Sequence, residues 1–118
     1  MTGSTGYHAG RVAEDIVARD YTDRDHQFAA KRWRGAGGEI DLIMRNGAQV
    51  IFVEVKKSAS FARAATRLGP KQRNRLVAAG SEFLATEPRG QLTDVRFDLA
   101  LVDGTGAVRV IENAFGDA

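Results

Sequence analysis

The chain has 118 residues, 17 of them basic and 15 acidic, with a formal net charge of +2 and no cysteine. This length suits one domain, residues 1–118, and the absence of cysteine excludes disulfides and thiolate zinc sites. The first ten residues lack the apolar core of a signal peptide, and no apolar run is long enough to span a membrane, so we expect a cytoplasmic protein without membrane association.

Apolar residues recur at helical spacing near the start of the chain and predict a first helix over about residues 8–20. They are Ala9, Val12, Ala13, Ile16 and Val17. Residues 1–5 are expected to be disordered. Residues 26–34 look extended and should pair with the next strand through the glycine-rich connection 35–38.

A hairpin follows, because Asn46-Gly47 is flanked by alternating apolar residues and both residues tolerate the positive φ of a type I′ turn. In that register Asp41 pairs with Phe52, and Glu39 pairs with Glu54. Side chains alternate along a strand, so one face should be continuously apolar and buried. That face consists of Ile40, Leu42, Met44, Ile51, Val53 and Val55.

Gly69-Pro70 predicts the start of a second helix, since proline is tolerated at the first helical position, and the helix should end before Pro88. Its expected apolar stripe is Leu76, Val77, Gly80, Phe83 and Leu84. Residues 95–101 alternate as a fourth strand, and residues 107–112 form a short fifth. A helix between strands three and four is the usual right-handed crossover between parallel neighbours. The expected fold class is α/β, with a mixed central sheet flanked by helices.

The polar face of the hairpin carries Asp41, Glu54 and Lys56, with Asp41 diagonal to Glu54. Carboxylate oxygens suit Mg²⁺ or Mn²⁺, and the Val55 carbonyl could complete the protein's share of the ligands. Such an ion can polarise a phosphoryl oxygen and lower the pKa of a bound water, while the lysine positions that water or offsets charge on the phosphate.

The alternative is that these charged residues are simply solvated. Ile43, Val50 and Phe52 share their face, however, which indicates that other elements cover it in part. Carboxylates placed close together under cover need a cation or a proton. The partial cover of these carboxylates therefore favours a metal site over simple solvation.

Residues 55–81 contain seven basic side chains and no acidic one. The basic residues are Lys56, Lys57, Arg63, Arg67, Lys71, Arg73 and Arg75. Such segregation attracts polyanions, and phosphate contacts of this kind select shape rather than sequence. DNA is therefore the expected partner, although an ordinary solvated loop and helix start would look similar.

Trp33 and the pair Arg96 and Asp98 each have two open interpretations. Trp33 could stack on a base, but a lone tryptophan at a strand end is more often packed. Arg96 and Asp98 share a face of the fourth strand, where they either pair with each other or leave Arg96 to contact a phosphate.

Four segments together resemble the YraN-like family of small bacterial proteins, over about residues 6–116. They are Trp33-Arg34, GEIDLI at 38–43, FVEVK at 52–56 and RFD at 96–98. That family is assigned by similarity to the restriction-endonuclease-like PD-(D/E)xK superfamily, near the archaeal Holliday-junction resolvases. The resemblance implies an α-β-β-β-α-β core, with Asp41 and Glu54 as metal ligands and Lys56 as the catalytic lysine.

The resemblance also implies that Glu14 on the first helix reaches the site, although a solvent-facing position is equally open. Glu39 would support the ligands or lie at the mouth of the site. Gln72, which we group with the nucleic-acid-binding candidates, matches the helix glutamine of some superfamily members, but Leu76 stands where those members have a tyrosine.

The expected function is a DNA endonuclease that uses Mg²⁺ or Mn²⁺ and acts at branched or unusual structures. The alternatives are a non-catalytic nucleic-acid-binding or adaptor module with the same fold and a protein-interaction domain without nucleic acid. Resolving a junction would require a homodimer, for which the outer side of the last strand or residues 111–116 is the candidate surface.

Overall fold

The computed structural model describes the backbone of residues 2–57 and 69–114, and the side chains within those ranges from residue 11 onward. The elements in chain order are α1 (Thr2–Asp23), β1 (Gln27–Gly35), β2 (Gly38–Asn46), β3 (Gln49–Lys57), α3 (Pro70–Leu84), the short 3₁₀ helix η1 (Gly90–Leu92), β4 (Val95–Val102) and β5 (Val108–Ile111). Within these ranges, no helix is long and apolar enough to cross a membrane.

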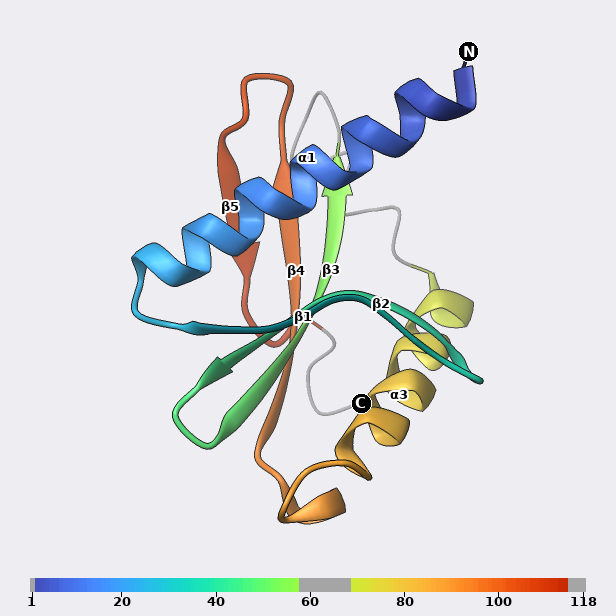
Figure 1. The fold of residues 1–118 in the computed structure, drawn as a ribbon, viewed down its shortest axis with the longest axis vertical. Coiled ribbons are helices and arrows are strands. Elements are labelled where there is room, and N and C mark those ends of the chain that lie inside the picture. The colour runs from blue at the N-terminus through green and yellow to red at the C-terminus, as the bar shows by residue number, and fades with distance from the viewer. Residues whose placement is uncertain (1, 58–68, 115–118) are drawn as a thin grey trace.

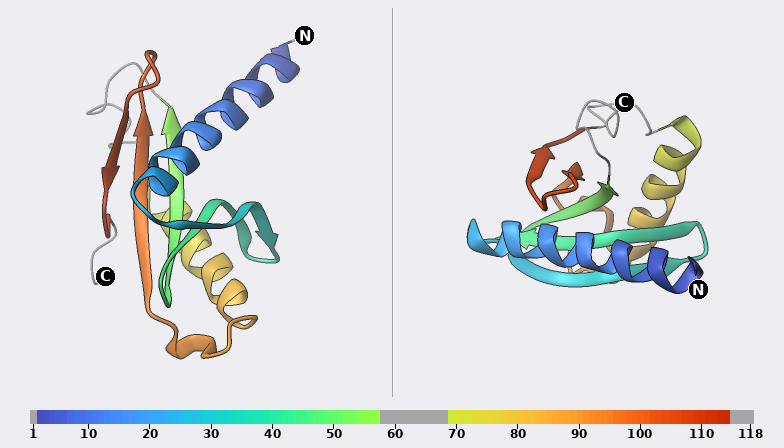
Figure 2. Two further views of the ribbon diagram at one scale, coloured as in Figure 1. Left: turned by 60° about the vertical axis from the view of Figure 1, so that its left-hand side comes forward. Right: turned by 90° about the horizontal axis from the view of Figure 1, so that it is seen from above.

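One five-stranded sheet has the order β1-β2-β3-β4-β5, and only the β3–β4 pair is parallel (Figure 1). The connection between β3 and β4 includes α3, which confirms the predicted crossover. In the left view of Figure 2, the β1–β2 ribbon passes between α1 and α3. The predicted α/β class with a mixed sheet and flanking helices is therefore confirmed.

The two long helices differ from the predictions at their ends and faces. α1 begins at Thr2 and so includes residues 2–5, which we expected to be disordered. Once a helix is nucleated, each added residue costs little, which allows the helix to begin earlier in the chain than predicted. In α3, Pro70 stands in the first turn as predicted, but Val77 is 51% exposed and Ala79 is buried in its place.

The hairpin turn lies one residue later than predicted. Asn46 pairs with Gln49, so Gly47 and Ala48 form the loop. Gly47 has a φ of 63° while Ala48 keeps a negative φ, as in a type II′ turn, which needs glycine only at its first central position. The register moves by two residues, and because side chains alternate with a period of two, the residues keep their faces and change their partners.

Two apolar clusters lie on opposite faces of the sheet. The α1 face is formed by Ala13, Val17, Tyr21, Leu42, Met44, Ile51, Val53, Ala100 and Val102. The α3 face is formed by Ile40, Ile43, Val50, Phe52, Leu76, Ala79, Phe83 and Leu84. Ile40 therefore belongs to the α3 face, not to the face of Leu42 as predicted, which shows that the alternation of β2 is interrupted between these two residues. Trp33 packs edge-on against Phe83, as expected for a packing residue.

The turn at residues 35–38 docks onto α3. Glu82 accepts hydrogen bonds from the backbone N–H groups of Ala36 (3.1 Å) and Gly37 (3.2 Å). A Cβ on Gly37 would lie 2.8 Å from that of Ala78, and one on Gly35 would collide with the Glu82 carboxylate. The glycines thus allow the turn to approach the helix closely, which fixes the start of β2.

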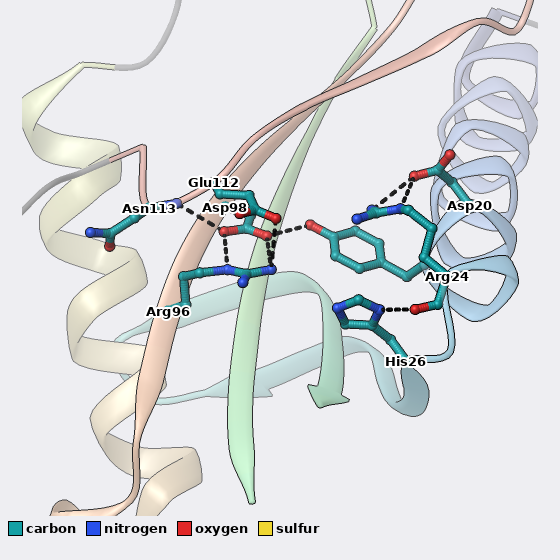
Figure 3. A network of polar contacts seen from close by, with 8 residues as sticks. Asp20, Arg24, His26, Arg96, Asp98, Glu112 and Asn113 are labelled. Atoms are coloured by element: carbon teal, nitrogen blue, oxygen red, sulfur yellow. Dashed lines mark hydrogen bonds and ion pairs between the residues drawn. The ribbon is translucent and has the colours of Figure 1, made fainter. Parts of the chain in front are cut away.

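A buried polar network holds the end of α1 to β4 (Figure 3). The Tyr21 hydroxyl donates to Asp98 Oδ2 at 2.6 Å, and the Arg96 guanidinium binds the same carboxylate at 2.9 and 3.0 Å. The backbone N–H of Asn113 donates to Asp98 Oδ1 at 3.0 Å. Arg96 and Asp98 therefore pair with each other, which was the first of the two interpretations.

Candidate functional site

Asp41 lies where β2 separates from β3. The paired residues of the two strands run from Asn46 back to Leu42 and stop there, while β3 continues beside β4. Beyond that point the Asp41 side chain takes the place of a strand, because its Oδ2 accepts the backbone N–H of Val55 at 2.9 Å. Continued by one residue, the register sets Asp41 opposite Glu54 rather than diagonal to it.

Glu54 is buried, at 6% exposed, and two side chains hold its Oε1. Lys56, on the same face of β3, lies 3.4 Å away. Gln72, from the first turns of α3, donates its Nε2 at 2.5 Å. The structure therefore brings Asp41, Glu54 and Lys56 together as the sequence predicted, and it shows that Gln72, also singled out from the sequence, is a direct partner of Glu54.

The two carboxyl groups are electrostatically unfavourable neighbours. Burial, followed by the charge of Asp41, raises the pKa of Glu54 to about 8, although Lys56 opposes this shift. Burial also raises the pKa of Asp41, while the hydrogen bond from Val55 opposes it. Two carboxylates that share a covered site disfavour double ionisation. The pair therefore favours a proton or a cation between its oxygens.

Glu14 also reaches this site, which settles its position against a solvent-facing one. Its side chain is 6% exposed, and its Oε2 accepts a hydrogen bond from Arg32 Nε at 2.9 Å. Burial and the charge of Asp41 raise the pKa of Glu14, whereas Arg32 lowers it. Arg32 was not predicted from the sequence, and its only signal was the Lys31-Arg32 pair in a strand that follows the acidic pair Glu14-Asp15.

Two clefts meet at a common wall formed by Glu39, Asp41 and Glu54. The α1-side cleft, of about 280 Å³, is also lined by Ala13, Glu14, Arg32, Val55 and Lys57. The α3-side cleft, of about 260 Å³, is also lined by Gly38, Gln72, Arg75 and Leu76. The carboxylates are thus accessible from both sides.

Glu39 does not pair with Glu54, so that prediction was wrong. The shifted hairpin register and the separation of the strands leave Glu39 paired with Arg34 of β1, and the two side chains are 3.6 Å apart. Glu39 nevertheless lines both clefts beside Asp41 and Glu54.

The predicted basic residues are only partly described. Lys57, Lys71 and Arg75 are exposed and Arg73 is half-buried, whereas Arg63 and Arg67 lie outside the described residues. Lys57 lines the α1-side cleft and Arg75 the α3-side cleft. Each cleft therefore has a cationic side chain from this segment.

The donor set fits a hard divalent cation. Within residues 2–57 and 69–114, no group of three or more acidic or histidine side chains is placed to hold a metal directly. An ion would therefore use two carboxylates, Asp41 and Glu54, with the Val55 carbonyl and water. Mg²⁺ is commonly held in this way, by one or two carboxylates and several waters.

The fold and this site define a protein with a restriction-endonuclease-like α/β core, in which strands two and three carry a D…ExK set of residues. A profile described as "Uncharacterised protein family UPF0102" matches residues 13–102. The chain belongs to the UPF0102 family, which confirms the resemblance to YraN-like proteins.

Similar proteins match over nearly the whole chain. A UPF0102 protein of Cereibacter sphaeroides (strain KD131) is 61% identical over 115 residues, covering 98% of both chains. One from Ruegeria pomeroyi is 58% identical, over 97% of this chain and 93% of the relative. One from Dinoroseobacter shibae is 45% identical, over 94% and 83% respectively.

Proposed function

We propose that this protein is a metal-dependent endonuclease that hydrolyses DNA phosphodiester bonds, with preference for branched or unusual structures. The observation that supports it most directly is the grouping of a buried carboxylate, Glu54, and a half-buried one, Asp41, with Lys56 where β2 leaves β3. Burial of charged groups at such cost is typical of sites tuned for chemistry.

Each side chain has a role that its contacts support. Asp41, fixed by the Val55 N–H, and Glu54, fixed by Gln72, would hold Mg²⁺ or Mn²⁺. The ion would supply Lewis-acid polarisation of the phosphate and a more acidic water. Lys56 would orient the attacking water or offset charge on the phosphate oxygens. The exposed basic residues Lys57, Lys71 and Arg75 would bind the flanking phosphates.

The test compares the parent with Asp41→Asn, Glu54→Gln and Lys56→Ala on linear, single-stranded, flapped and four-way DNA in Mg²⁺ or Mn²⁺. We expect the parent to cleave and each variant to lose at least about 100-fold in rate, as when one electrostatic group is removed from an active site. Equal cleavage by all four proteins would identify a contaminant and refute the proposal.

A second candidate is a non-catalytic nucleic-acid-binding or adaptor module. The direct donors in the described residues are two carboxylates rather than three, which favours this candidate more than a larger cluster would. It predicts salt-dependent DNA binding that survives Asp41→Asn and Glu54→Gln, with no cleavage in either metal. Cleavage lost in these variants would exclude it.

A further inference from the structure

The backbone of β1 is irregular at Arg32. Its φ is 51°, in the left-handed region that residues with a Cβ seldom adopt. Arg32 lies between the pairs Lys31–Leu42 and Trp33–Ile40, which sets it across from Asp41. Strained residues persist where the surrounding structure imposes them, and they cluster at functional sites. The strained residue of β1 therefore faces the residue at which β2 leaves β3.

This backbone changes where the Arg32 side chain points. Neighbouring residues of a regular strand point to opposite faces of the sheet. Lys31 and Arg32 nevertheless both form ion pairs with α1, Lys31 with Asp15 and Arg32 with Glu14. The left-handed conformation thus turns Arg32 to the same side as Lys31.

The two ion pairs have different surroundings. The Asp15 side chain is 59% exposed, and neither Asp15 nor Lys31 lines the carboxylate clefts. Glu14 is buried, and Glu14 and Arg32 both line the α1-side cleft with Asp41 and Glu54. A purely structural clamp, in which the ion pairs only hold β1 against α1, would explain the contact of Lys31 equally well. It does not explain why a residue with a strained backbone lies at the cleft.

On the basis of the proposed function, we propose that Arg32 is a positioning residue of this site. Its guanidinium fixes the Glu14 carboxylate at the cleft wall next to Asp41, so that the cleft presents a third carboxylate to the water shell of a bound ion. An arginine suits this role because its rigid, always charged fork orients a carboxylate in a way that a flexible ammonium does not.

Calorimetric titration of the full chain with Mn²⁺ tests this role. Arg32→Gly removes the guanidinium and accommodates the left-handed backbone, so it avoids the strain that Arg32→Ala would keep. We expect Arg32→Gly to weaken Mn²⁺ binding about 10- to 100-fold, as for residues that orient ligands, and Arg32→Lys to recover part of the loss. The matched control Lys31→Ala should change the affinity less than twofold. Equal weakening by Lys31→Ala and Arg32→Gly would overturn the proposal and leave only a clamp.

A metal-free measurement separates this inference from the nuclease proposal. With a chelator present, the ¹³C carboxyl resonance of Glu14 should shift in Arg32→Gly and stay in place in Lys31→Ala. If the Glu14 resonance did not change in Arg32→Gly, the positioning role would be refuted even if the protein binds Mn²⁺ and cleaves DNA. A parent that binds no Mn²⁺, with a Glu14 resonance that depends on Arg32, would instead refute the metal site of the proposed function.

Discussion

At the scale of single residues, the carboxylates of the site are held in surroundings that oppose their charge. Glu54 contacts Lys56 and Gln72, yet burial and the nearby Asp41 still outweigh the favourable contact with the lysine. A neutral side chain would be more stable than Glu54 at this position, yet the sequence has an ionisable carboxyl there. Its cost to the fold can be measured directly.

We predict that Glu54→Gln stabilises the metal-free protein at pH 8. The pKa of Glu54 is raised from 4.5 to about 8 in the fold, so the folded state binds an extra proton between these values. Stability from this group is therefore greatest below about pH 4.5 and is lost as the pH rises towards 8. At about 1.4 kcal/mol per pKa unit this shift corresponds to roughly 4–5 kcal/mol, so the variant should gain several kcal/mol at pH 8 and little at pH 4.5, because it removes the ionisation. Urea unfolding with a chelator at both pH values measures this, and an equal gain at both would contradict it.

A second residue-scale prediction concerns the buried network of Tyr21, Asp98 and Arg96. Tyr21→Phe removes the donor to Asp98 Oδ2 and should cost about 1–3 kcal/mol of unfolding free energy, because a buried charged acceptor loses a partner. The comparison variant Tyr21→Leu should cost more, since it also replaces a fully buried ring with a smaller side chain. Thermal or urea unfolding distinguishes the two variants, and an unchanged stability of Tyr21→Phe would show that Arg96 and the Asn113 N–H satisfy Asp98 without the tyrosine.

The residue scale also shows what the sequence could reveal. Asp41, Glu54 and Lys56 were identifiable because strand alternation and the hairpin signal place them on one face. Arg32 was not, since a left-handed conformation at an arginine results from the surrounding packing and has no local signature. Glu39 was misplaced because the pairing depended on which residue begins the turn.

At the scale of elements, the site depends on how the β1–β2 ribbon is set against α3. The Glu82 carboxylate receives two backbone N–H groups of the turn at 35–38, three residues before Asp41. The helices and strands themselves followed from periodicity and from glycine and proline signals. The bend of β2 at Asp41 did not, because docking of the turn on α3 overrides the local alternation.

We predict that Glu82→Ala loosens this turn. It leaves the N–H groups of Ala36 and Gly37 without their acceptor and should cost about 1–2 kcal/mol of stability. Glu87→Ala is the matched control just beyond the C-terminal end of α3, because Glu87 pairs with Arg45 near the hairpin tip and not with the turn at residues 35–38. Hydrogen exchange should accelerate at residues 36–37 in Glu82→Ala and not in Glu87→Ala. Equal exchange in both variants would mean that packing alone holds the turn.

At the scale of the whole molecule, the charge is unevenly distributed along the chain. The excess of basic residues between 55 and 81 stands against an acidic remainder, and two of its described members, Lys57 and Arg75, line the two clefts. A polyanion would therefore be attracted to the side of the molecule that carries the carboxylates.

We predict that Lys71→Ala/Arg75→Ala weakens DNA binding and lowers the salt dependence. Each lost phosphate contact should reduce the slope of log affinity against log salt by about 0.9 for duplex DNA. The control Arg89→Ala/Arg109→Ala removes the same charge from exposed positions outside the basic segment and should leave the slope nearly unchanged. Fluorescence anisotropy at several salt concentrations measures both, and equal slopes for the two double variants would refute a localised interface.

For the proposed metal-dependent nuclease, the wall shared by the two clefts would allow two series of chelating inhibitors. A chelating compound that captures an ion at Asp41 and Glu54 could extend into either side, where it would meet different neighbours. Towards α1 the compound would need a group compatible with the ion pair of Arg32 and Glu14. Towards α3 it would meet the side chains of Gln72 and Arg75. Selectivity among small molecules would therefore be decided by their substituents, with the chelating head common to both series.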